Sequence, residues 1–134
     1  SEHTVHGGIT AWRVPSTTSM VGSDAQSRRI FFTTALEGKL SEDELIAALA
    51  HEQAHLTGHH ALLRHVATLA SATAPAFTSS REMSRATRIA TELAADDAAA
   101  RQCGAETVAR ALRSSFPNEG FIDERVERLL GHLS

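Results

Sequence analysis

The segment from Leu40 to His60 constrains the fold of this chain more than any other, because it combines helix signals with metal-binding residues. It reads LSEDELIAALAHEQAHLTGHH. Ser41 and Glu44 have the spacing of a capping box, which predicts that a helix starts at residue 41. We expect the helix to reach about Thr57, where Gly58 can end it. Leucines at helical spacing give it a side for burial in a core: Leu45, Leu49 and Leu56.

The pattern H-E-x-x-H occupies residues 51–55 of this predicted helix. Because residues four apart lie one turn apart on the same face, His51 and His55 can both bind one metal ion. Zinc accepts imidazole nitrogen at about 2.0–2.1 Å, which this spacing allows. Glu52 is rotated by about 100° from His51, so it can reach a metal-activated water as a general base without being a ligand on that face. Small residues precede the histidines and would leave room for a substrate: Ala47 and Ala48.

Before this helix, short β-type runs at residues 9–14 and 29–34 predict two or three strands, with residues 19–21 as a further edge. Residues 1–8, which contain His3 and His6, have the character of a loose, solvated end. We therefore expect a small N-terminal β-sheet between residues 9 and 34.

After this helix, the periodicity predicts further helices. One spans residues 61 to about 72. The next opens at a capping box of Ser79 and Glu82 and ends at Cys103, before Gly104. Two more are expected at residues 105–115 and 123–130, separated by a turn at 116–120. The fold class is then α+β and mostly helical: a single domain over residues 1–134, with its helical part at about 41–134.

The composition excludes several function classes. A net charge of −3 without a dense basic run gives no electrostatic basis for binding nucleic acid. The single Cys103 excludes an internal disulfide and a Cys-rich zinc site. The sequence contains no run of about 18 apolar residues, so we expect no membrane span in this chain. The chain starts at Ser1 without a signal peptide, so we expect processing or a domain cut from a longer protein.

A catalytic zinc needs three protein ligands and one open position. A histidine six residues after His55 would give the metzincin pattern, but Ala61 stands there. The third helix offers Glu92 with Asp96 one turn later, beside apolar neighbours. A buried carboxylate is costly unless it is paired or bound to metal, so Glu92 is the candidate third ligand. Asp96 could accept the N–H of a ligand histidine and fix its tautomer.

Simpler interpretations stay open for each of these residues. His51 and His55 could lie on a partly exposed helix face without metal. Glu92 could pair with Arg88 one turn earlier, and Asp96 could form a salt bridge. The remaining polar residues near the motifs are most simply a solvated surface: Arg81, Arg85, Arg88, Asp97, His59 and His60.

Together, H-E-x-x-H and a later helix with E-x-x-x-D resemble the gluzincin zinc metallopeptidases. The stretches DELIAALAHEQAH and TELAADDAAARQCG resemble two bacterial branches, the HtpX-like and CAAX-prenyl-protease group and the antirepressor peptidases of β-lactam sensor-transducers. The interval from His55 to Glu92 and the Ala-Pro-Ala-Phe stretch at 74–77 favour the second branch. The resemblance covers about Arg29 to Gly104.

This resemblance implies a zincin-like fold and a zinc-dependent endopeptidase acting on protein or peptide substrates. His51, His55 and Glu92 would bind one Zn²⁺ per chain, with Glu52 as general base and Asp96 orienting a ligand. Relatives are typically membrane-embedded, which implies flanking membrane segments in a longer chain and this domain on the cytoplasmic side. Because the chain has no Tyr, the oxyanion would be stabilised by the zinc alone, an Arg, or a nearby histidine: His59, His60 or His65.

Two other functions fit the same sequence. One is a zinc-binding but catalytically inactive sensor or docking domain, against which the intact Glu52 argues. The other is a metal-free helical interaction domain in which the motifs arise by chance. A chelator should leave the stability of the metal-free domain unchanged, whereas a zinc-bound fold should lose stability.

Overall fold

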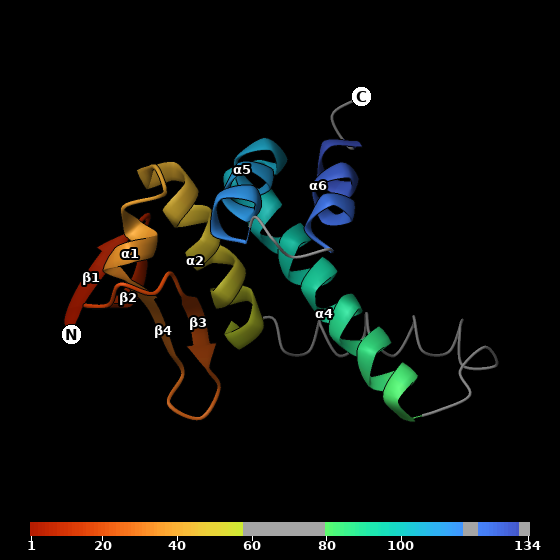
Figure 1. The fold of residues 1–134 in the computed structure, drawn as a ribbon, viewed down its shortest axis with the longest axis horizontal. Helices are drawn as coiled ribbons and strands as arrows, with labels where there is room; N and C mark the ends of the chain where they lie inside the picture. Colours follow the sequence, from red (N-terminus) through yellow and green to blue (C-terminus); the bar gives the residue numbers. More distant parts are fainter. Residues whose placement is uncertain (58–79, 117–120, 132–134) are drawn as a thin grey trace.

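The computed structural model describes residues 1–57, 80–116 and 121–131 (Figure 1). Within them the strands are β1 (Glu2–His6), β2 (Ile9–Val14), β3 (Val21–Asp24) and β4 (Arg29–Thr33). The helices are α1 (Thr34–Glu37), α2 (Glu42–Thr57), α4 (Ser80–Cys103), α5 (Ala105–Ser115) and α6 (Ile122–Gly131). The predicted α+β class with a small N-terminal sheet is confirmed. Several sequence predictions lie outside the described residues: the helix at 61–72, the cap at Ser79, the turn at 117–120, and His59, His60 and His65.

The sheet is mixed, with strand order β1-β2-β4-β3. β2 and β4 run parallel, while β1 pairs with β2 and β3 pairs with β4 in antiparallel fashion. β1 and β3 are therefore the edges. The edge expected at residues 19–21 overlaps β3 only at Val21. The strand lies further along because the Asp24 carboxylate accepts hydrogen bonds from Gln26 N and Ser27 Oγ, and this turn sets the register of the β3–β4 hairpin.

The prediction of a loose end at residues 1–8 is wrong, because β1 pairs with β2 along its whole length. Gly7 and Gly8 have positive φ angles of 56° and 81°, which allow the tight turn between the two strands. His6 is buried, and its Nδ1 lies 2.7 Å from Glu42 Oε1 at the start of α2. Its ring also packs edge-on against Phe32. His6 thus joins the sheet to α2 as a structural residue.

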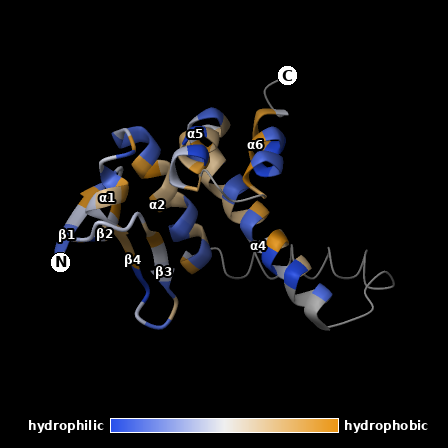
Figure 2. Cartoon of the chain, viewed as in Figure 1, coloured by the Kyte–Doolittle hydropathy of each residue, from blue (hydrophilic) through white to orange (hydrophobic). Residues whose placement is uncertain are grey.

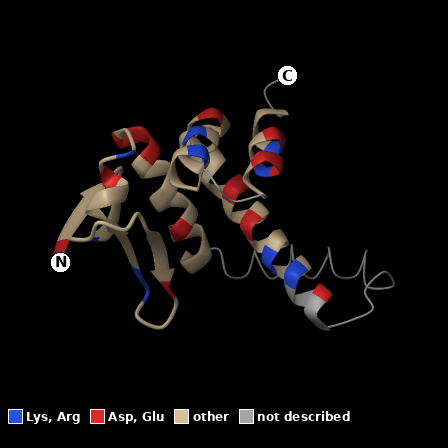
Figure 3. Ribbon diagram, in the orientation of Figure 1, with Lys and Arg blue, Asp and Glu red and all other residues tan. Residues whose placement is uncertain are grey.

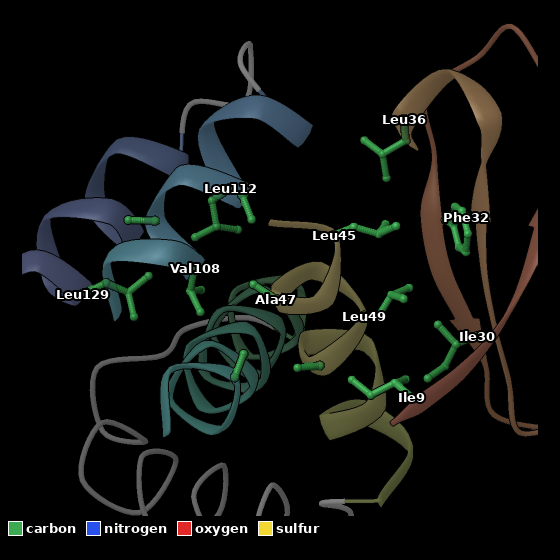
Figure 4. Packing of buried hydrophobic residues seen from close by; sticks show 14 of the residues in the cluster. Ile9, Ile30, Phe32, Leu36, Leu45, Ala47, Leu49, Val108, Leu112 and Leu129 are labelled. Carbon is green, nitrogen blue, oxygen red and sulfur yellow. The ribbon is translucent and has the colours of Figure 1, made fainter. Parts of the chain in front are cut away.

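α2 begins as predicted. Ser41 N donates to Glu44 Oε1 at 2.9 Å, and Glu44 N donates to Ser41 Oγ at 3.2 Å, which completes the capping box. The helix lies between the sheet on one side and α4 and α5 on the other (Figure 1). Leu45 and Leu49 point toward the sheet, whereas Ala47 faces α5 (Figure 4). Burial on both sides fixes the rotation of α2 about its axis, and with it the direction of its polar side chains.

The core continues through the later helices. α4 packs along α2, and its buried alanines take little space at this contact: Ala90, Ala95 and Ala99. Gly104, with a φ of +90°, separates α4 from α5 as predicted. α6 is amphipathic in Figure 2 and buries Ile122, Val126 and Leu129, which recur at helical spacing. None of the helices in the described ranges is long and apolar enough to cross a membrane.

Candidate metal centre

Three predicted ligands meet where α2 packs on α4. His51 Nε2 lies 3.0 Å from Glu92 Oε2 and 3.1 Å from His55 Nε2. His55 Nε2 lies 3.4 Å from Glu92 Oε1. One possible ligand atom from each of these three side chains lies within 4.8 Å of the other two, which is close enough to hold one metal ion. The structure therefore brings together His51, His55 and Glu92, which are separated by up to 41 positions in the sequence.

The separations within this group fit a zinc ion. Four ligands placed tetrahedrally at about 2.0–2.1 Å from zinc have donor atoms about 3.3 Å apart. The distance of 3.1 Å between the two ring nitrogens, and those of 3.0 and 3.4 Å from these nitrogens to the two Glu92 oxygens, lie close to that value. Two imidazole nitrogens and one carboxylate are also a donor set found in catalytic zinc sites. Three ligands leave a fourth position open for water or a substrate.

The other ring nitrogen of His51 faces Asp96. His51 Nδ1 lies 2.9 Å from Asp96 Oδ1, in a bent contact that falls short of a well-aligned hydrogen bond. Asp96 is fully buried and accepts from both Nε and Nη2 of Arg125, each at 2.8 Å. Asp96 therefore forms the salt bridge of its simpler interpretation, with Arg125, and also lies beside His51. Asp97 pairs instead with Arg128, nearer the surface.

The sequence reasoning missed Arg125. It is only 5 % exposed, and its Nη2 also lies 3.5 Å from Glu92 Oε2. A signal for it was present, since Arg125 occupies the face of α6 that also carries Ile122, Val126 and Leu129. A charged residue on an apolar helix face must either find a buried partner or disrupt the core. This criterion would have indicated a carboxylate partner for Arg125 elsewhere in the chain.

These contacts set the protonation of the centre in the metal-free chain. Burial of the ring would lower the pKa of His51, but the carboxylates of Asp96 and Glu92 outweigh it and raise the pKa to about 9. Burial likewise works to raise the pKa of Glu92, yet hydrogen bonds and charge attraction from His51 and His55 hold it well below its ordinary range. The pKa of Asp96 is lowered in the same way by Arg125 and His51, against its burial. The metal-free centre thus holds two carboxylates beside a protonated imidazole. A metal cation can take the place of the proton on that ring.

Glu52 lies next to the centre, where two hollows of the surface meet. One is a small apolar pocket between β3, α2 and α5, and Ala47 and Ala48 line it as expected. Its other walls are mainly apolar: Val21, Val108, Ala111, Leu112 and Phe116. The second hollow is an open cleft along α4 that contains Glu92, Arg85 and Arg88. Glu52 lines both hollows and makes no hydrogen bond or ion pair with any residue of the described ranges.

The model of the family described as peptidase family M48 matches residues 19–90, more than half of the chain. The chain belongs to this family. M48 peptidases are zinc-dependent, so the resemblance to zinc metallopeptidases is confirmed. The matched part of this M48 chain contains His51, Glu52 and His55 but ends in α4 just before Glu92. A search of curated proteins and a search of solved structures gave no match.

Proposed function

We propose that this M48 chain is a zinc-dependent endopeptidase in which His51, His55 and Glu92 hold one Zn²⁺ and Glu52 is the general base. The convergence of His51 Nε2, His55 Nε2 and the two Glu92 oxygens at separations of 3.0–3.4 Å, beside the Glu52 carboxylate that lines the cleft, carries this proposal. Core residues of the sheet and of the described helices α2, α4, α5 and α6 join one cluster, which supports a single domain over residues 1–134. From the resemblance alone, we also propose that the domain works on the cytoplasmic side of a membrane as part of a longer chain.

The residues divide the reaction between them. Zinc, when bound, lowers the pKa of water from 15.7 toward about 7 and polarises the carbonyl of the scissile bond. Glu52 accepts the proton of the attacking water and delivers it to the leaving amine, a role worth about 10²–10⁴-fold in rate. Asp96 holds the Nδ1 side of His51, which keeps Nε2 directed at the metal position. Arg125 keeps Asp96 ionised and in place.

The surroundings of the centre also fit a peptide substrate. β3 is an edge strand, and its Val21 lines the apolar pocket beside His51 and Glu52. An extended peptide can add to such an edge through backbone hydrogen bonds, independently of its side chains. We propose that the peptide lies along β3 and places an apolar side chain in this pocket. The buried hydroxyl of Ser115 in the pocket wall has no hydrogen-bond partner among the described residues.

Zinc content and peptide cleavage test this function together. We would purify wild type, Glu92→Ala and Glu52→Gln without added metal and measure zinc per chain and hydrolysis of a mixed peptide library. Wild type should hold about one zinc and cleave peptides. Glu92→Ala should lose most of its zinc, because a two-ligand site binds weakly. Glu52→Gln should keep its zinc and lose turnover by about 10²–10⁴-fold.

Each alternative gives a different pattern. If Glu92→Ala keeps about one zinc per chain, the third ligand must be a residue other than Glu92. Full zinc in wild type without any cleavage would favour the inactive sensor or docking domain. No zinc in wild type, even after zinc is added back, would contradict the metallopeptidase function for this chain.

A further inference from the structure

Arg85 and Arg88 lie on the same face of α4 as Glu92. They line the open cleft that also contains His51 and Glu52. At about 1.5 Å of rise per residue, Arg88 stands about 6 Å and Arg85 about 10.5 Å from Glu92 along the helix axis. In Figure 3 one acidic residue at the start of α4 precedes the basic residues, and further acidic residues follow them along the same helix. The cleft therefore changes from carboxylates at the metal centre to guanidinium groups along its length.

Neither arginine has a partner among the described residues. Both are exposed and form no hydrogen bond or ion pair there. The simpler interpretation of Glu92, an ion pair with Arg88, does not hold in the structure, because the Glu92 oxygens face His51, His55 and Arg125 instead. Other arginines of the described ranges do form ion pairs, among them Arg13, Arg110, Arg125 and Arg128. Two positive charges thus face this cleft without an ion-pair partner among the residues that the structure describes.

We infer that Arg85 and Arg88 bind an acidic side chain of the peptide substrate; this inference rests on the proposed endopeptidase function. An extended peptide advances about 3.3 Å per residue, so a carboxylate about two or three residues from the scissile bond would come within reach of these guanidinium groups. Arginine binds carboxylates through paired N–H donors, which gives geometric selectivity as well as attraction. A bound Zn²⁺ would offset the charges of Glu52 and Glu92, so the two arginines would leave the loaded cleft positive.

An anionic membrane surface fits these residues less well. Recognition of anionic lipid typically uses clusters of about four to eight Lys and Arg residues on one face. Here two arginines share a concave cleft with Ile89, Phe116 and the metal centre. A peptide can enter such a cleft, whereas a planar lipid surface cannot follow it.

The test compares peptides that differ by one charge. Wild type, loaded with zinc, would cleave matched peptide pools in which each position near the scissile bond is Glu or Gln. We expect kcat/KM about three- to tenfold higher for Glu at the favoured position, a ratio that falls to about one in Arg85→Gln/Arg88→Gln. Cleavage of the Gln peptides should fall less than cleavage of the Glu peptides, because the Gln peptides lack the carboxylate that the two arginines would bind. Arg101→Gln is the matched control, because Arg101 is an exposed arginine of α4 outside the cleft.

A binding measurement separates this inference from the function on which it rests. In the Glu52→Gln background, fluorescence anisotropy should show the same three- to tenfold preference for Glu peptides, lost when both arginines are replaced. Equal affinity for Glu and Gln peptides, or a preference that survives the double replacement, would overturn the inference while leaving the endopeptidase intact. Arginine-dependent binding to vesicles with one-third phosphatidylserine, without any Glu preference, would assign the pair to lipid instead. If wild type cleaves no peptide but the anisotropy preference is present, the proposed function fails and the acidic-peptide site stands.

Discussion

Replacement of Arg125 should affect both the fold and the metal centre, because this side chain reaches Asp96 behind His51. Its guanidinium donates two hydrogen bonds of 2.8 Å to a carboxylate that is 0 % exposed. Arg125→Met removes the charge and leaves Asp96 buried without its main partner. Arg125→Lys keeps a positive charge but offers no planar fork, so the second bond is lost.

The size of each effect follows from these contacts. Breaking a buried ion pair by removing one partner costs about 3–5 kcal/mol of unfolding free energy, so we expect that loss in Arg125→Met. A hydrogen bond to a charged group contributes about 1.5–3 kcal/mol, which is the loss expected in Arg125→Lys. For a domain with a total stability of about 5–15 kcal/mol, the Met variant would be near the limit of folding, whereas the Lys variant should stay folded. Zinc affinity should fall by about 10–100-fold in Arg125→Lys, because Asp96 would hold His51 less firmly.

Urea denaturation of the chelated protein would measure the stability, and competition with a chromogenic chelator would measure the zinc affinity. Arg128→Lys is the matched control. Arg128 also donates two hydrogen bonds, at 2.7 Å each, but to Asp97, and both side chains are about one-third exposed. That replacement should cost about 0–1 kcal/mol and leave zinc affinity unchanged. Unchanged or tighter zinc binding in Arg125→Lys, at normal stability, would refute the positioning role of Arg125.

Two further predictions follow from the pKa of His51 and from the turn between β1 and β2. The pKa of His51 in the metal-free chain is raised to about 9, and the imidazole must lose its proton to bind zinc. Zinc affinity should therefore rise about tenfold per pH unit from pH 7 to about 9. An affinity that does not change over this pH range would contradict the raised pKa. Because this folded-state pKa lies above the ordinary value of 6.5, the protonated ring stabilises the metal-free protein fully below about pH 6.5, and urea midpoints should fall as the pH rises through 9. Gly7→Ala should cost about 1–3 kcal/mol in urea denaturation, since its φ is +56° and the new Cβ would stand 2.8 Å from Ile46 Cγ2. Gly8→Ala, with a φ of +81° and no atom within 4 Å of the new Cβ, should cost about 1 kcal/mol; equal losses would contradict the packing of this turn on α2.

The features of the fold that could be predicted from the residue order are local ones. The capping box of Ser41 and Glu44 set the start of α2, and Gly104 set the boundary of α4 and α5. The four-residue spacing put His51 and His55 on one face, and the same spacing put Glu92 and Asp96 on one face of α4. Such features depend on hydrogen bonds and side-chain contacts within one or two helical turns, which the order of residues fixes directly.

Contacts between residues far apart in the chain depend instead on how the helices and strands pack. Strand pairing made β1 an ordered edge strand where the residue pattern alone predicted a loose end, although Gly7 and Gly8 between two β-type runs were a signal for a hairpin. The packing of α6 brought Arg125 onto Asp96 across 29 positions of sequence. It also left Arg85 and Arg88 facing the cleft while Glu92 turned to the histidines. Burial makes an unpaired charge costly, so the partner of Arg125 is determined by which carboxylate the core encloses, and that is a property of the packed chain.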